Sequence, residues 1–574
     1  DDRVAAMTVD PANRVVVTGT SQGDYTTITF SSAGVLLWTN RYDRGDDGAS
    51  AVATDSSGNV FVTGGSDFGT GPDWATVKYS SSGSELWANH YNGRASSDGY
   101  PQAVAVDGSG NVIVTGYSYG NGSYQDYATI KYSSAGVALW TNRYNGPANG
   151  TDEAVAVAVD SSGNVFVTGH SQSSSADYFT IAYSSAGSTL WSRRYNGSAN
   201  ANDLAYAMVL DSTGNVIVTG YSIDSISAGD YLTIKYSNGG FPLWTNQYSG
   251  AGAFDDYAQA VAVDSSGNVI VTGYVTSSAG DYDYATIKCS SSGVPLWTNR
   301  YHGPGNDNDQ AYAVVVDHSD NVIVTGSSHG DAADYDFLTI KYSSVGVALW
   351  TNRYNGPANG YDQAWSVAVD KSDNVIVTGG VSSEATGYDY VTIKYSSAGV
   401  ALWTNRYNGP GNDYDDAYAV AVDGDDTVFV TGYSYSSAVS GDFATIAYSS
   451  TGAPLWTNHY NGPGNGEDYP STSRSLAVVG TGSVVVAGQS RRGQHSEYAT
   501  VKYVTAPRLD IRRTATNTVA VSWPSPSSGF QLRQNTNLAG TNWTTTSAPS
   551  DDGTNKTFLV NPPNGSRFYR LFYQ

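Results

Sequence analysis

Aspartates recur at two positions of a regular pattern, and their carboxylates are the groups in this chain best placed to do chemistry. The first position lies eight residues before a second aspartate. Its members are Asp2, Asp47, Asp152, Asp203, Asp256, Asp309, Asp362 and Asp415. The second position precedes a Tyr- and Thr-rich stretch, at Asp24, Asp73, Asp126, Asp177, Asp230, Asp283, Asp336, Asp389 and Asp442, with Glu497 in the last copy. Such carboxylates either accept hydrogen bonds from backbone amides and hydroxyls at loop ends or hold a hard cation with loop carbonyls.

The cation hypothesis has a best local cluster, Asp413, Asp415 and Asp416, which we take as candidate metal ligands, with calcium as the ion. The turn at 423–426 is a weaker candidate, and neither segment matches an EF-hand loop. Strands that run up and down bring both recurring positions to one face. That face is the candidate binding surface, with Asp152, Asp203, Asp256, Asp309, Asp362, Asp415, Asp283, Asp336 and Asp389 as its residues.

Other catalytic patterns are absent from the sequence. The seven histidines occupy unrelated phases of the pattern, and no two have the spacing of metal ligands. Neither a nucleophile elbow, a P-loop nor a dinucleotide fingerprint occurs. Cys289 stands where other copies have Tyr, which indicates a structural position. Residues 132–150 and 342–360 differ at one position only, whereas an active site needs one asymmetric group of residues. We therefore expect no enzymatic activity.

A tandem repeat positions these residues. The motif Val-x-Val-Thr-Gly recurs with its glycine at Gly19, Gly64, Gly116, Gly169, Gly220, Gly273, Gly326, Gly379 and Gly432, and a weaker tenth copy ends at Gly488. A period of about 50 residues is typical of solenoids, propellers and arrays. The repeat predicts one domain over residues 1–504 and a separate one over 505–574.

Each unit predicts four short strands. In residues 152–195 these are 154–159, 164–168, 178–183 and 189–195, separated by turns rich in Gly, Ser and Asp. Apolar residues stand at adjacent positions, as in Val-Ile-Val and Leu-Trp, so we expect cover on both faces of each sheet. Radial stacking of blades in a propeller supplies that cover. The small-residue strand fits the axis and the Trp strand the wide rim, where we expect the tryptophans in the core.

The segments Asp-Ser-Ser-Gly-Asn-Val-Phe-Val-Thr-Gly at 160–169 and Asp-Tyr-Ala-Thr-Ile-Lys-Tyr-Ser-Ser-Ala-Gly-Val-Ala-Leu-Trp at 126–140 resemble the bacterial β-propeller repeat family (SBBP). The resemblance covers residues 1–504. It implies a propeller fold and a secreted or surface location, and it implies no activity.

The last unit has no Leu-Trp strand of its own. The sequence therefore predicts an all-β fold with one ring of about ten four-stranded blades, the last incomplete. Ten exceeds the usual range of about 4–8, and two five-bladed rings are the alternative, although no linker interrupts the middle repeats. An open edge recruits strands, which makes Tyr498 and Tyr503 candidate assembly residues.

The tail from residue 506 alternates like a small β-sandwich, with strands predicted at 509–513, 519–523, 531–534, 556–560 and 567–572. Val-Ser-Trp-Pro at 521–524 resembles fibronectin-type-III-like modules, and the ending at 567–571 resembles C-terminal modules of secreted bacterial proteins. The tail is basic and the remainder acidic, so docking is one hypothesis and ordinary surface charge the other. Arg512, Arg513, Arg567 and Arg570 are its candidate assembly residues.

The net charge of -23 makes nucleic acid or an anionic membrane face a poor partner. No apolar run approaches the length that spans a bilayer. Because the chain starts at Asp1 inside a repeat, we expect a processed chain, extracellular or on a bacterial surface. The first hypothesis is a non-enzymatic structural or adhesive protein that binds itself or other surface proteins. The alternatives are a cation-dependent glycan-binding module and a polysaccharide lyase or lactonase-like enzyme.

Overall fold

The computed structural model describes residues 3–573 apart from short segments. The segments outside the described residues are 22–23, 32–35, 45–46, 68–71, 94–98, 121–123, 212, 224–228, 251–254, 306, 331–333, 384–386, 438–439, 462–466, 471–475, 479–481, 493–494, 505–509, 514–517, 525–529, 537–542, 552–554 and 561–566. Every regular element in the described part is a β-strand. A helix long and apolar enough to cross a membrane is therefore not found there.

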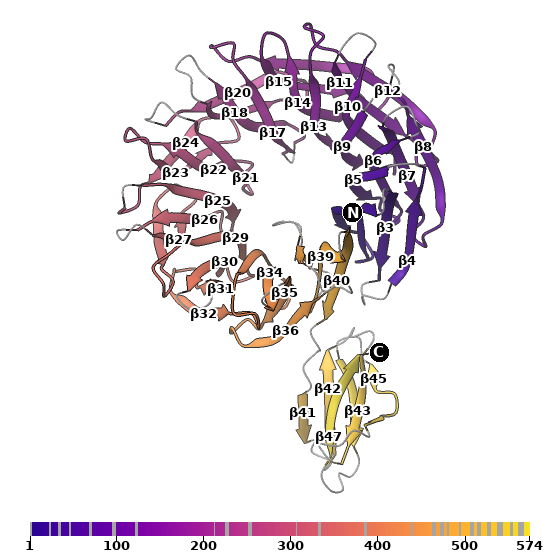
Figure 1. The fold of residues 1–574 in the computed structure, drawn as a ribbon, viewed down its shortest axis with the longest axis vertical. Helices are drawn as coiled ribbons and strands as arrows, with labels where there is room; N and C mark the ends of the chain where they lie inside the picture. The colour runs from indigo at the N-terminus through magenta and orange to yellow at the C-terminus, as the bar shows by residue number, and fades with distance from the viewer. Residues whose placement is uncertain are drawn as a thin grey trace.

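Successive groups of strands form antiparallel sheets, called blades here, which lie around a common centre (Figure 1). The inner strands are β1 (Arg3–Val9), β5 (Asp47–Thr54), β9 (Gly99–Val106), β13 (Asp152–Val159), β17 (Asp203–Leu210), β21 (Tyr257–Val263), β25 (Asp309–Val316), β29 (Asp362–Val369) and β33 (Asp415–Val422). The second strands are β2 (Val15–Ser21), β6 (Val60–Asp67), β10 (Val112–Tyr119), β14 (Val165–Gln172), β18 (Val216–Ile223), β22 (Val269–Thr276), β26 (Val322–His329), β30 (Val375–Ser383) and β34 (Val428–Ser437).

The outer half of each blade follows the same order. The third strands are β3 (Asp24–Phe30), β7 (Pro72–Tyr79), β11 (Gln125–Tyr132), β15 (Ala176–Tyr183), β19 (Gly229–Tyr236), β23 (Tyr282–Cys289), β27 (Tyr335–Tyr342), β31 (Gly387–Tyr395) and β35 (Ser440–Tyr448). The rim strands are β4 (Leu36–Tyr42), β8 (Glu85–Tyr91), β12 (Ala138–Tyr144), β16 (Thr189–Tyr195), β20 (Pro242–Tyr248), β24 (Pro295–Tyr301), β28 (Ala348–Tyr354), β32 (Ala401–Tyr407) and β36 (Pro454–Tyr460).

The glycine of the repeated motif has a steric cause. In the fourth blade the inner strand bulges between Ala154 and Ala156, opposite Gly169 and Thr168. The bulge brings the carbonyl oxygen of Glu153 so close that a β-carbon on Gly169 would lie 2.0 Å from it. Only glycine fits there without a shift, which explains why the motif ends in glycine in every copy.

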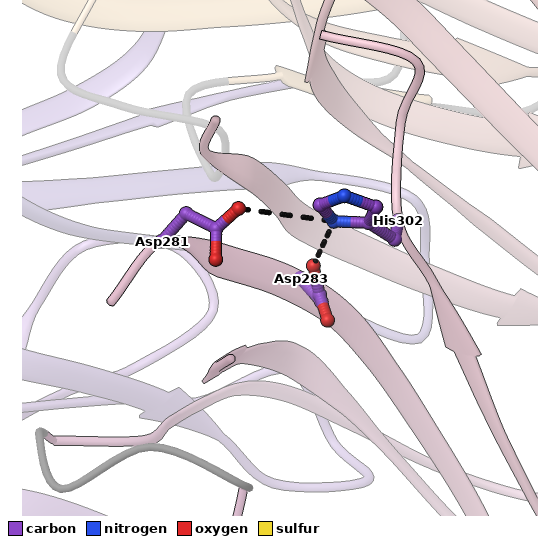
Figure 2. A group of neighbouring side chains, drawn as sticks. All are labelled: Asp281, Asp283 and His302. Carbon is purple, nitrogen blue, oxygen red and sulfur yellow. Dashed lines mark hydrogen bonds and ion pairs between the residues drawn. The ribbon is translucent and has the colours of Figure 1, made fainter. Parts of the chain in front are cut away.

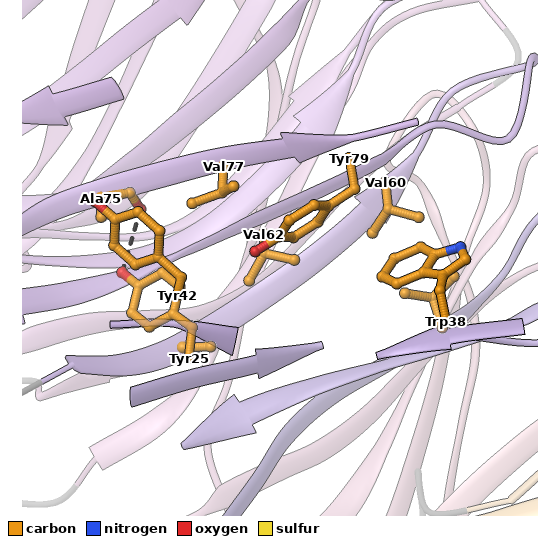
Figure 3. Packing of buried hydrophobic residues seen from close by; sticks show 10 residues of the cluster. Tyr25, Trp38, Tyr42, Val60, Val62, Ala75, Val77 and Tyr79 are labelled. Atoms are coloured by element: carbon orange, nitrogen blue, oxygen red, sulfur yellow. Dashed lines mark hydrogen bonds between the residues drawn. The ribbon is translucent and has the colours of Figure 1, made fainter. Parts of the chain in front are cut away.

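Large aromatic residues fill the space between neighbouring blades. In the first joint Trp38 of β4 packs against Val60, Val62 and Tyr79 of the second blade (Figure 3). Its indole ring centroid lies 5.5 Å from that of Tyr79. The indole N–H also donates to a turn carbonyl of the next blade, as in Trp38 to Ser81 at 3.4 Å and Trp350 to Ser397 at 3.2 Å. Trp38, Trp191 and Trp244 are buried in the core as expected, whereas the other six rim tryptophans are partly buried and pack against the core clusters.

The expectation of cover on both sides of every strand is wrong at the rim. The second strands are fully covered, and Val165, Phe166 and Val167 are each 0% exposed. The leucine before each rim tryptophan is only partly covered. Leu349, for example, is 50% exposed. Successive side chains of a strand point to opposite faces, so the tryptophan meets the next blade while the leucine remains in solvent.

The tenth blade differs from the others in the described residues. Its inner strand is divided into β37 (Asp468–Pro470) and β38 (Leu476–Val478), both paired with β39 (Ser483–Arg492), and β40 (His495–Val504) completes the sheet. No fourth strand is described for this blade. Val485 and Ala487 of β39 form a buried cluster with Val15 and Val17 of the first blade.

The tail forms two small sheets outside the ring of blades (Figure 1). One contains β41 (Asp510–Arg513), β42 (Val519–Pro524), β46 (Asn555–Val560) and β45 (Ser550–Asp551). The other contains β44 (Thr544–Thr545), β43 (Phe530–Asn535) and β47 (Phe568–Tyr573). Val521, Trp523 and Leu532 form its buried core. The strands lie within a few residues of the predicted segments.

Candidate metal centre and binding face

Both recurring aspartates lie at the same end of each blade. In the fourth blade Asp152 pairs with Ser171, and Ser171 pairs with Asp177 on its other side. We call this end of the blades the loop face, because the Tyr-Asn-Gly-Pro loops lie there. The opposite end is called the turn face. It carries the turn Asp-Ser-Ser-Gly-Asn at 264–268 and the equivalent turn Asp-Lys-Ser-Asp-Asn at 370–374.

The first aspartate of each pair closes a loop onto its blade. The carboxylate of Asp152 is fully buried and accepts hydrogen bonds from the backbone N–H groups of Gly146, at 2.6 Å, and Gln172, at 3.1 Å. The same bond from a glycine six residues earlier occurs at Asp203, Asp256, Asp309, Asp362 and Asp415. These contacts favour the hydrogen-bonding interpretation of this position. Asp2 lies outside the described residues.

Burial makes these carboxylates hard to ionise. It raises the pKa of Asp256 and Asp415 to about 6 and the pKa of Asp362 to about 7, although backbone N–H groups oppose the shift. None of the three has an ion-pair partner among the described contacts that would restore an ordinary pKa.

The second aspartate mostly faces an arginine of the rim strand. Arg143 lies 2.7 Å from Asp126, Arg194 lies 2.8 Å from Asp177, and Arg353 lies 2.7 Å from Asp336. Arg406 likewise contacts Asp389. The predicted binding residues Asp336 and Asp389 are therefore already held by cations of the protein itself.

The structure does not bring Asp413, Asp415 and Asp416 together as one metal site. Asp413 is exposed in a loop, whereas Asp415 is buried against Gly409. Asp416 follows Asp415 in the strand and faces the other side, where its carboxylate accepts hydrogen bonds from Trp365 and Tyr414, each at 3.2 Å. Burial raises the pKa of Asp416 to about 7.

A different group has the geometry of metal ligands. Asp281, Asp283 and His302 each offer one ligand atom, and these atoms lie within 4.8 Å of one another (Figure 2). It is the one such group of three found in the described part of the chain. Nδ1 of His302 lies 2.7 Å from an oxygen of Asp283 and 3.8 Å from one of Asp281. Arg300 contacts the other oxygen of Asp283 at 2.6 Å.

Sequence reasoning named Asp283 but missed Asp281 and His302. The ligands come from the start of β23 and from the loop after β24, and only the strand pairing brings these segments together. One signal was available in the sequence. The sixth repeat reads Tyr-His-Gly-Pro at 301–304, where four other copies read Tyr-Asn-Gly-Pro.

Aromatic pairs also gather on the loop face. Tyr312 stacks on Trp365 of the next blade with ring centroids 5.0 Å apart, and Tyr335 stacks on Tyr361 at the same distance. Tyr206 and Tyr361 are each 55% exposed. This face therefore offers planar apolar surfaces next to buried carboxylates.

The candidate assembly residues have varied surroundings. Tyr503 is 8% exposed and packs on Trp456, so its side chain belongs to the core of the last joint. Arg567 is exposed and donates to Gln534, and the guanidinium of Arg570 lies 4.2 Å from the ring centroid of Trp543. Arg512 is exposed. Tyr498 and Arg513 lie in strands, but their side chains are outside the described residues.

Parts of the chain are similar to known proteins. A family model described as a beta-propeller repeat (SBBP) matches residues 140–175. An uncharacterised WD repeat-containing protein of Acanthamoeba polyphaga mimivirus is 24% identical over 412 residues, which are 61% of this chain and 25% of that protein. The chain thus spans about a quarter of the length of this relative.

Solved structures that match the chain have low sequence identity to it. A eukaryotic initiation factor gives a TM-score of 0.43 at 8% identity, covering 72% of this chain and 89% of the other. A protein from Lactobacillus plantarum gives 0.34 at 13% identity, covering 69% and 99%. The family match supports propeller repeats in this chain, and its four-stranded antiparallel sheets are consistent with a β-propeller fold.

Proposed function

We propose that this chain is a secreted, non-enzymatic structural or adhesive protein of a bacterial surface. In this proposal one closed ring of ten blades carries a fibronectin-III-like sandwich at its C-terminal end. The buried cluster of Val15, Val17, Val485 and Ala487 between the first and tenth blades supports closure. The two small sheets around Trp523 support the sandwich.

One observation carries the proposal, a belt of exposed leucines with one member on each rim strand. The leucine belt consists of Leu37, Leu86, Leu139, Leu190, Leu243, Leu296, Leu349, Leu402 and Leu455, all 44–51% exposed. Single exposed leucines are ordinary, but contiguous or regularly repeated apolar surface marks a contact site. In the seventh blade Val347, 61% exposed, lies two residues before Leu349 and enlarges the surface. A surface repeated around a ring suits many equal, weak contacts.

The tenth blade adds a candidate joint for assembly. Its third strand β40 pairs with β39, and no rim strand of this blade is described. Phe30, the first-blade residue equivalent to Tyr79, is only half-buried, whereas Tyr79 lies under a tryptophan and is 2% exposed. A strand from a second molecule would complete the sheet and cover Phe30, and repetition would build a head-to-tail filament.

Glycan binding is the second candidate, and the aromatic pairs of the loop face favour it. Exposed tyrosines such as Tyr206 and Tyr361 can stack on sugar rings, while Asn and Asp side chains accept and donate hydrogen bonds. The cation dependence predicted with this function would require a metal ion near that face.

Electron microscopy of the purified chain tests the first proposal. We expect filaments or sheets, which should dissociate when Leu349 and Leu402 are both replaced by serine and when residues 506–574 are deleted. A double variant at two exposed polar rim residues, Thr351→Ser and Thr404→Ser, serves as the control. Isolated rings under all conditions would contradict assembly, and binding on a glycan array would then support the second candidate. Turnover of a polysaccharide or lactone would contradict the non-enzymatic assignment.

A further inference from the structure

We infer that Asp281, Asp283 and His302 bind a divalent transition-metal ion, with Zn²⁺ as the reference case. The inference is independent of the proposed function, because it rests on the sixth blade alone. All three ligand atoms lie on the loop face, within 4.8 Å of one another (Figure 2). Zn²⁺ bonds of about 2.0–2.2 Å place tetrahedral ligands about 3.3 Å apart. The separations of 2.7 and 3.8 Å from Nδ1 of His302 bracket that value.

The carboxylate of Asp281 points to a cation in particular. Its side chain is 9% exposed, and both of its oxygens are buried without a hydrogen-bond partner. A buried carboxylate without donors is costly. One of its oxygens is directed towards His302 and lies 3.8 Å from Nδ1 (Figure 2). A metal ion between Asp281 and His302 would supply the missing partner.

The seventh blade shows what the same place looks like without a metal site. There Asp334 and Asp336 stand where the sixth blade has Asp281 and Asp283, and Asn355 replaces His302. Asn355 donates a hydrogen bond to Asp334 at 2.9 Å, so this buried carboxylate is satisfied by the protein. Exchanging the amide for an imidazole removes that donor and introduces a nitrogen ligand. The sixth blade is therefore a variant of a structural site with the ligand set of a metal centre.

The ligand types select the metal. One imidazole and two carboxylates suit Zn²⁺, Co²⁺ and related ions, whereas Ca²⁺ takes six to eight oxygen ligands. Arg300, which holds the second oxygen of Asp283, limits that carboxylate to one ligand atom. Because the side chain of His302 is 42% exposed, a fourth coordination position would open to solvent. Three protein ligands with one open position are typical of zinc sites that bind water or an external ligand.

Metal titration of the full-length chain tests the inference. Isothermal calorimetry with Zn²⁺ should show one bound equivalent, and Co²⁺ should give a visible absorption band of a nitrogen- and oxygen-ligated ion. His302→Asn rebuilds the arrangement of the seventh blade and should fold normally. We expect it to weaken binding about tenfold or more, and Asp281→Asn should do the same.

His318→Asn is the matched control. His318 also contacts a carboxylate, that of Asp373 at 2.8 Å, but it has no third ligand within reach among the described residues. Its replacement should leave the affinity unchanged. Equal Zn²⁺ binding by the wild type and His302→Asn, or no binding by the wild type, would overturn the inference. Displacement of Zn²⁺ by millimolar Ca²⁺ would overturn the choice of metal class.

Discussion

Buried aspartates on the two faces of the ring have pKa values that shift in opposite directions, as Asp264 and Asp362 show. On the turn face Asp264 accepts hydrogen bonds from Ser266, Asn268 and the ammonium of Lys288, which lies 2.7 Å away. Burial alone would raise the pKa of Asp264, but the bonds from Lys288 and Asn268 lower it. On the loop face Asp362 meets only backbone N–H groups, and burial raises its pKa to about 7.

This difference indicates which end of the repeat can accept residue changes that add a ligand. A turn-face aspartate ionises readily because its own blade brings the lysine, as in Lys131 with Asp107 and Lys394 with Asp370. On the loop face the second aspartate of each pair mostly faces an arginine, but burial raises the pKa of first aspartates such as Asp256, Asp362 and Asp415, so a proton is favoured at those carboxylates. The unpaired Asp281 and the exchange of Asn for His302 both occur on the loop face.

The substitution with the largest expected effect on stability is Lys288→Met. The pair with Asp264 is almost fully buried, with both side chains 1% exposed. Removing one partner of a buried ion pair leaves an uncompensated charge and destabilises by about 3–5 kcal/mol. We expect a loss of this size in equilibrium urea unfolding followed by tryptophan fluorescence.

Its control is the double variant Lys288→Met with Asp264→Asn, which removes the charge as well and should recover most of the stability. The fourth blade provides a natural comparison. There Ala182 stands in place of Lys288, and Asn238 donates a hydrogen bond at 2.9 Å to Asp160, the equivalent of Asp264. If Lys288→Met and the double variant unfold at the same urea concentration, the ion pair does not distinguish the two faces.

The second largest expected change is a gain in stability rather than a loss, and it depends on pH. Asp416→Asn on the loop face removes a carboxyl whose pKa burial raises to about 7. The folded state holds this proton more tightly than the unfolded state, so wild-type stability falls as the pH rises from about 4 to about 7. We expect Asp416→Asn to be more stable than the wild type at pH 8, by about 1–3 kcal/mol.

Scanning calorimetry at pH 5 and pH 8 checks this prediction. The gain should shrink at pH 5, because the wild-type carboxyl is then protonated and neutral. Asp264→Asn should instead destabilise to a similar extent at both pH values, since the lowered pKa of Asp264 keeps this carboxyl ionised in the folded state at pH 5 and at pH 8. An Asp416→Asn gain that is the same at both pH values would show that ionisation is not its cause.

Sequence reasoning predicted the regular parts of this molecule well. The Gly-Asn turns, the Val-rich second strands and the tail strands follow from local residue patterns, and the structure places each within a few residues of its predicted position. The loop-end role of Asp152 could also be predicted, because its amide donors lie in the adjoining loop and strand.

The features that sequence reasoning did not predict depend on three-dimensional geometry, which local residue patterns do not reveal. Leu349 was expected to be covered, but it points to the face opposite Trp350 and is 50% exposed. Asp415 and Asp416 are sequence neighbours, yet the pleat directs them to opposite faces. The metal centre joins Asp281 to a residue 21 positions later through strand pairing, so sequence spacing alone did not reveal it.

The smallest and most direct test makes one substitution, Asn to His, on each face. On the turn face Asn374 donates to Asp370 at 2.8 Å inside a tight turn, and Asn374→His should cost about 1–2 kcal/mol because the turn loses a fitted donor. On the loop face Asn355→His places an imidazole beside Asp334 and Asp336, as His302 lies beside Asp281 and Asp283. Without metal its stability should fall by about 1–3 kcal/mol, because the buried carboxylate of Asp334 loses the donor that Asn355 supplies.

The same Asn355→His variant should bind a second equivalent of Zn²⁺ in a calorimetric titration, whereas Asn374→His should bind no more than the wild type. The reason is that the loop face supplies two carboxylates, Asp334 and Asp336, and Arg353 holds one oxygen of Asp336 as Arg300 holds one oxygen of Asp283. On the turn face Asp370 is paired with Lys394 at 2.7 Å. No second equivalent in either variant would mean that the loop face accepts new ligands no better than the turn face. One added equivalent confined to the loop face would locate the capacity for new ligands in its carboxylates.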